Sequence, residues 1–162
     1  MSTSGTTGTD AARQVVEALA DHEDAIGDLY ETYGVRFADA ASFWRGLSAE
    51  EYGHGSLMRD LAGHEHEGEL DVFVDTGRFP LTELRRATRD VRDQIEVAEN
   101  SRVTLDEALE TALAFEQEIV EREAYQVFTS DSTNVARVLG HLRQSSERHR
   151  DAIRAFLARR SR

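Results

Sequence analysis

The chain has 162 residues, of which 31 are acidic and 19 are basic, and its formal net charge at pH 7 is −12. Every basic residue is arginine, and so acidic a surface repels phosphate backbones and anionic lipids, which argues against nucleic-acid and membrane partners. The absence of cysteine excludes disulfides, thiolate metal sites and a cysteine nucleophile, and it fits a cytoplasmic protein.

The N-terminal segment MSTSGTTGTD has neither the basic start nor the apolar centre of a signal peptide. No apolar run in the chain approaches the roughly 20 residues that a membrane-spanning helix needs. We therefore expect a disordered tail over residues 1–10 and one helical domain over residues 11–162.

Apolar residues recur every three or four positions in the first part of this domain, as on one face of a helix. This spacing predicts a first long helix from Ala11 to Phe37 and a second that carries Phe43 to Leu61. Residues 63–80 hold three glycines and the only proline, so they predict a connection with at most a short extended piece within 70–74.

A shorter and more charged helix is predicted after Pro80, and we expect it to lie across the bundle. Thr104 and Glu107 have the spacing of a capping box and predict the start of a third long helix, whose apolar stripe reaches Val127. A fourth helix follows the SDST segment and extends to Leu157. The predicted fold is an all-α four-helix bundle with a long crossover, containing the extra short helix, so that helices two and three run parallel.

Ionisable residues interrupt the apolar stripe of each long helix. A buried carboxylate costs several kcal/mol unless it is paired or binds a cation, so several of them in one bundle require a common partner. A metal ion would serve, because carboxylate oxygen and imidazole nitrogen bind iron, manganese or zinc, and residues three apart on a helix share a face. The ionisable residues at these positions are Glu23, Glu51, His54, Glu116, Glu123 and His149, and the fourth stripe also contains the polar Ser146.

These residues resemble the ligand pattern of the ferritin-like superfamily, and most closely that of rubrerythrin-type di-iron bundles. That pattern has Glu on the first and third helices and Glu-x-x-His on the second and fourth. The segments HEDAIGDLY with Glu23, EYGH with Glu51 and His54, and ALAFE with Glu116 match it over roughly residues 11 to 158. On the first helix, Glu23 precedes Tyr30 by seven residues. Glu118 precedes Tyr125 by the same spacing, so it competes with Glu116 as the matching residue of the third helix.

The fourth helix departs from the family pattern. Its segment SERH supplies His149 but has Ser146 where the family has Glu, and Glu147 lies about 100° away around the helix. The resemblance implies a ferritin-like bundle with two iron ions that oxidises iron or reduces oxygen or peroxide. The chain has no cysteine for a rubredoxin module, so such a cycle would need an external electron donor.

Three interpretations of the ligand set stay open at this stage: two metal ions, one metal ion, or a vestigial site in a non-catalytic interaction or assembly module. Bundles of this superfamily commonly pair, and the segments with Phe37, Phe73, Val74 and Phe79 hold apolar residues that one bundle would leave uncovered. We therefore also expect a homo-oligomer, at least a dimer.

Overall fold

The computed structural model describes residues 5–64, 72–74, 80–118, 128–130 and 133–161. Its elements are α1 (Gly5–Arg36), the short 3-10 helix η1 (Ala38–Ala40), α2 (Ala41–His64), β1 (Val72–Val74), α3 (Leu81–Asn100), α4 (Leu105–Gln117), β2 (Phe128–Ser130) and α6 (Thr133–Arg160). The two short strands pair antiparallel, with Phe73 opposite Thr129. The all-helical class predicted from the sequence is confirmed, and so is the short extended piece between the second and third long helices.

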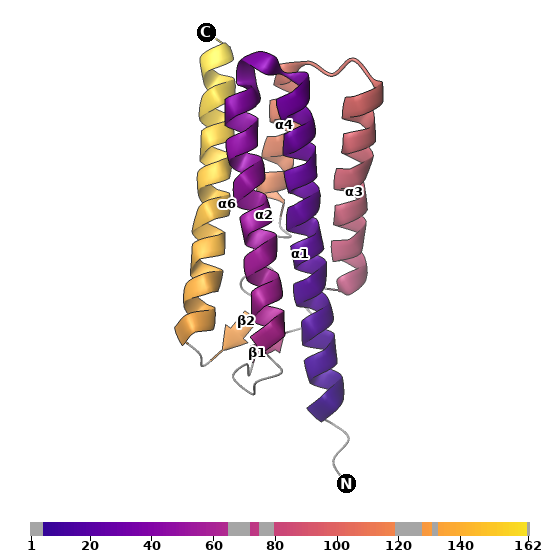
Figure 1. Cartoon of the computed structure of the whole chain (residues 1–162), viewed down its shortest axis with the longest axis vertical. Helices are drawn as coiled ribbons and strands as arrows, with labels where there is room; N and C mark the ends of the chain where they lie inside the picture. The colour runs from indigo at the N-terminus through magenta and orange to yellow at the C-terminus, as the bar shows by residue number, and fades with distance from the viewer. Residues whose placement is uncertain (1–4, 65–71, 75–79, 119–127, 131–132, 162) are drawn as a thin grey trace.

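The helices pack side by side along one long axis (Figure 1). The chain rises along α1, returns along α2, rises again along α3, descends along α4 and ends along α6. The second and third long helices of the sequence prediction, α2 and α4, therefore run in the same direction (Figure 1). None of the described helices combines the length and the apolar character that a bilayer span requires.

Helix α3 differs from the prediction. It has 20 residues and lies alongside α1 instead of crossing the bundle (Figure 1). The reason is its long buried stripe, which extends from Leu84 through Val91 to Ala98. A stripe of that length is covered only when the neighbouring helix runs beside it, whereas a crossing helix would cover it at one point.

Two helix boundaries also differ from the prediction. Helix α1 begins at Gly5, inside the segment for which the sequence predicts a disordered tail. The prediction places the start of the helix at the first residues of its apolar stripe, whereas a helix can extend beyond the residues that it buries. Helix α4 ends at Gln117, whereas the third long helix was expected to continue to Val127. Residues 119–127, which include Glu123, lie outside the described residues.

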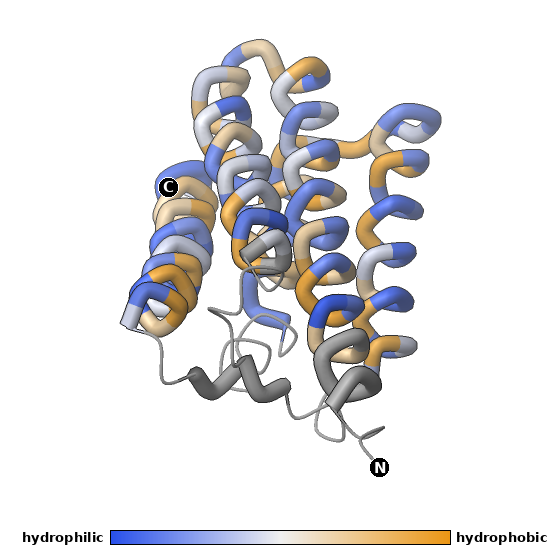
Figure 2. Tube along the Cα trace, turned by 60° about the horizontal axis from the view of Figure 1, so that its bottom comes forward, coloured by the Kyte–Doolittle hydropathy of each residue, from blue (hydrophilic) through white to orange (hydrophobic). Residues whose placement is uncertain are grey.

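Within the described part of the chain, the core consists of two apolar clusters. Hydrophobic and hydrophilic residues alternate along the helices that surround it (Figure 2). One cluster includes Leu19, Met58 and Leu142. The other includes Ile26, Trp44, Leu109 and Ile153. Along α1, α2 and α6, the chain passes from one cluster to the other through a short polar segment. The polar layer between the two clusters contains buried glutamate and histidine side chains.

Candidate metal centre

Five ionisable side chains from four helices meet in this polar layer. Each has at most 4% of its surface exposed: Glu23 of α1, Glu51 and His54 of α2, Glu116 of α4 and His149 of α6. They form two groups of possible metal ligands, in which the ligand atoms lie within 4.8 Å of one another. The two groups share Glu51.

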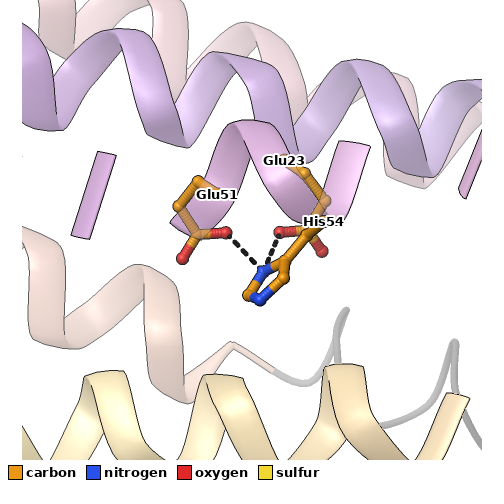
Figure 3. A group of neighbouring side chains, drawn as sticks. All are labelled: Glu23, Glu51 and His54. Atoms are coloured by element: carbon orange, nitrogen blue, oxygen red, sulfur yellow. Dashed lines mark hydrogen bonds and ion pairs between the residues drawn. The ribbon is translucent and has the colours of Figure 1, made fainter. Parts of the chain in front are cut away.

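The first group joins Glu23, Glu51 and His54. The Nδ1 atom of His54 lies 3.1 Å from Oε2 of Glu51 and 3.5 Å from Oε2 of Glu23. Figure 3 shows the imidazole between the two carboxylates, with the second oxygen of Glu51 directed away from His54. Glu51 and His54 reach one another because residues three apart lie on the same helix face.

The second group joins Glu51, Glu116 and His149. The Nδ1 atom of His149 lies 2.6 Å from Oε1 of Glu51 and 3.6 Å from Oε1 of Glu116. Tyr30 donates a hydrogen bond of 2.7 Å to the same oxygen of Glu116. The rings of His54 and His149 stack at 5.5 Å. Each oxygen of Glu51 thus faces a different histidine, so its carboxylate connects the two groups.

Glu50 is a further participant, which the sequence reasoning missed. Its Oε2 atom lies 3.0 Å from Nε2 of His149, and its side chain is 52% exposed. Both ring nitrogens of His149 therefore face carboxylates. Glu50 lies off the apolar stripe of α2, and its sequence position gives no signal of this contact.

The pKa values follow from burial and from these contacts. Burial and the neighbouring Glu51 raise the pKa of Glu23 to about 7. Burial by itself lowers the pKa of a histidine, but the carboxylates of Glu23 and Glu51 raise that of His54 to about 9. In the same way, Glu116 and Glu51 outweigh burial and raise the pKa of His149 to about 11. Without a metal ion, both imidazoles are therefore positively charged at neutral pH, with a proton on each ring nitrogen.

Glu118, the competing candidate on the third long helix, lies outside both groups, and Ser146 makes a separate contact. Ser146 is buried, but its hydroxyl donates to the carbonyl of Leu142 at 3.3 Å. Glu118 follows the last residue of α4, and burial together with the nearby Asp90 raises its pKa.

The neighbour of Glu23, His22, is buried but serves a different contact. Its Nδ1 atom lies 3.2 Å from the hydroxyl of Thr88 on α3. The Thr88 hydroxyl donates to the carbonyl of Leu84, so the His22 Nδ1–H donates to Thr88. Burial lowers the pKa of His22, which agrees with a neutral ring in this position.

The donor set fits a metal ion. It offers three carboxylates and two imidazoles, the ligand types that iron, manganese and zinc accept. Among the described residues, Oε2 of Glu116 is buried without a hydrogen-bond partner, and such an atom is costly unless a cation or a donor reaches it. Comparisons of the chain with protein-family models, curated proteins and solved structures gave no match. The function of the chain is therefore inferred from the geometry of the centre.

Proposed function

We propose that this protein is a ferritin-like metal-binding protein that holds two iron ions in the bundle core and oxidises iron or reduces oxygen or peroxide. The observation that carries the proposal is the shared carboxylate of Glu51, whose two oxygens face different histidines in two adjoining ligand groups. The Glu51 carboxylate would therefore take part in holding both ions. Manganese or zinc would suit the same donors.

The ligands divide between two positions. Glu23 and His54 would hold one ion, Glu116 and His149 the other, and Glu51 both. Bound iron would supply the one-electron steps that neither a carboxylate nor an imidazole provides. Tyr30 keeps Glu116 in place through its hydrogen bond, and the apolar clusters on both sides exclude water. In iron oxidation, Fe(II) itself would supply the electrons. Repeated reduction of oxygen or peroxide would need an external donor, because the chain has no cysteine that could ligate a second redox centre.

The direct test is an anaerobic Fe(II) titration of the purified chain, followed by exposure to oxygen or peroxide. Two bound ions per chain and a fast oxidation phase are expected. One bound ion per chain would reduce the proposal to a single-metal centre. Failure to retain iron above the background level after reconstitution would contradict it.

The alternative is a non-catalytic bundle with a vestigial site that serves as an interaction or assembly module. The observation in its favour is that both nitrogens of His149 already contact carboxylates, while the Ser146 hydroxyl donates to the carbonyl of Leu142. Protonated histidines that contact carboxylates would balance the buried charges of this layer without a metal ion.

Thermal melting of Glu51→Ala with and without Fe(II) separates the two functions. A metal centre predicts that Fe(II) raises the Tm of the parent chain and that Glu51→Ala loses this rise, because only a folded site binds the ion. A vestigial site predicts no metal-dependent rise in either protein. Glu110→Ala, at an exposed position of α4, is the matched control and should behave as the parent chain does.

Association belongs to the proposal as well. We expect at least a homodimer, although Phe37 supports it less than the sequence indicated, because this side chain is half-buried against the second apolar cluster. The side chains of Phe73 and Val74 and the whole of Phe79 lie outside the described residues. Light scattering that returned the chain mass of 18.2 kDa at micromolar concentration would contradict association.

A further inference from the structure

The two histidines of the centre differ in what lies at their outer nitrogens. On His149, Nδ1 faces the ligand carboxylates, and Nε2 lies 3.0 Å from the partly exposed Glu50. On His54, Nδ1 also faces the carboxylates, but no described carboxylate contacts Nε2. Its other aromatic neighbour is the exposed His141, whose ring lies 6.5 Å away.

The contact with Glu50 matters for metal binding because an imidazole binds a metal through a nitrogen that carries no proton. An ion held by Nδ1 of His149 requires the remaining proton to stay on Nε2. Glu50 accepts that N–H, so it favours the required tautomer and fixes the direction of the ring. A carboxylate that accepts the outer N–H of a ligand histidine also makes the inner nitrogen a stronger donor.

Glu50 is itself held in place by helix α6. Its Oε2 atom accepts a hydrogen bond of 3.3 Å from Ser145 and lies 3.7 Å from the Arg148 guanidinium. On the other side of the same ligand group, Tyr30 fixes Glu116. The Glu51–Glu116–His149 group therefore has supporting contacts at two of its three ligands.

We propose that Glu50 is a positioning residue that holds His149 for metal binding through Nδ1, so that the Glu51–Glu116–His149 group binds the tighter of two ions. This inference rests on the proposed function and adds to it which of the two ligand groups binds its ion more tightly. The Glu23–Glu51–His54 group, whose histidine has no carboxylate at its outer nitrogen among the described residues, binds the weaker ion.

The test is a Co(II) titration followed by absorption and by calorimetry. The parent chain should bind two ions in two steps of unequal affinity. Glu50→Ala should weaken the tighter step by roughly 10–100-fold, the usual effect of removing such a supporting contact, and leave the weaker step unchanged. Glu50→Gln should restore most of the affinity, because its amide oxygen can still accept the Nε2–H of His149.

A second measurement on the metal-free protein reports the contact directly. In ring-nitrogen NMR spectra of the parent chain, the His149 Nε2 proton should exchange slowly with water, and Glu50→Ala should accelerate this exchange. Glu147→Ala is the matched control, because Glu147 is exposed on α6 two residues from His149. It should change neither the Co(II) affinities nor the exchange rate.

The outcomes separate this inference from the proposed function. If the parent chain binds two Co(II) ions and Glu50→Ala leaves both steps unchanged or weakens both equally, the inference is wrong and the proposed function stands. A parent chain that binds no Co(II) overturns both.

Discussion

At the scale of single residues, neighbours decide the state of each buried charge. Glu50 and Glu51 are adjacent in the sequence, yet one is half exposed and the other almost completely buried. Burial and the nearby Glu116 tend to raise the pKa of Glu51, but the two imidazoles outweigh them and lower it below its usual value. The charge of the Glu51 carboxylate therefore depends on His54 and His149.

A first prediction concerns Ser146, a buried residue of α6. Ser146→Glu places a fourth carboxylate in the layer, three residues before His149. With metal present it should tighten binding, since a carboxylate is a better ligand for a hard cation than a hydroxyl. Without metal, the added charge should destabilise the fold by about 1–3 kcal/mol.

Calorimetric unfolding and an Fe(II) titration of this variant measure both effects. Ser146→Gln is the control, because it has nearly the same shape without the charge and should not tighten binding. Destabilisation of Ser146→Glu with no gain in affinity would show that Ser146 does not border a metal position.

A second prediction concerns the pH dependence of the metal-free protein. The folded-state pKa values of His54 and His149, about 9 and about 11, lie above the ordinary value of 6.5. Their contribution to stability is therefore fully present below pH 6.5 and is lost as the pH rises through these values. The pKa of Glu23, raised from 4.5 to about 7, acts in the same direction at lower pH.

Stability should thus fall as the pH rises from neutral toward the folded-state pKa of His54. On the acid side, Glu51 and His22 act oppositely, because their pKa values are lowered and their contributions are lost as the pH falls. Thermal melts in the presence of a chelator measure the effect, and His149→Gln should flatten the alkaline decline. A Tm that increased between neutral and alkaline pH would contradict this assignment.

At the scale of the elements, α4 is the shortest of the four helices that contribute to the candidate metal centre. It has 13 residues, and Glu116 lies in its last turn. A capping box begins the helix: Thr104 accepts from the backbone N–H of Glu107 at 3.2 Å, and the Glu107 carboxylate accepts from the backbone N–H of Thr104 at 2.8 Å. The position of Glu116 thus depends on a short helix whose start is fixed by two residues.

A third prediction follows from this cap. Thr104→Ala should destabilise the protein by about 1 kcal/mol, because the backbone N–H at the third position of α4 loses its acceptor. Urea unfolding measures the change, and Thr104→Ser, which keeps the hydroxyl, should remain close to the parent chain. An unchanged unfolding midpoint in Thr104→Ala would show that solvent replaces the cap without cost.

At the scale of the whole molecule, the fold places a charged layer between two apolar clusters and carries a net charge of −12. The inner charges are shielded from salt by burial, whereas the outer ones are not. Exposed ion pairs such as Arg160 with Asp106 contribute little individually. Repulsion among the excess carboxylates is therefore the larger long-range effect at the surface.

A fourth prediction is that added NaCl stabilises the protein. Raising the ionic strength shortens the screening length to about 10 Å at 0.1 M and reduces the repulsion between acidic side chains. Thermal melts at low and high NaCl should show an increase in Tm. A series with an uncharged osmolyte controls for effects unrelated to charge, and a decrease in Tm with NaCl would mean that surface ion pairs dominate.

The sequence by itself determined the helical class, the parallel course of α2 and α4, the cap at Thr104 and the inward positions of the five Glu and His residues. The helical class and the inward positions depend on local spacing, because residues three, four and seven apart share a helix face whatever the helix packs against. The cap depends on two residues three apart, and the parallel course depends on the long connection between the two helices. The tertiary structure decided that α3 lies along α1, that each oxygen of Glu51 faces a different histidine, and that Glu50 contacts His149. The physical reason is sequence separation: Glu51 and His149 are 98 residues apart, and their contact depends on how α2 and α6 are rotated against each other, which no local pattern specifies.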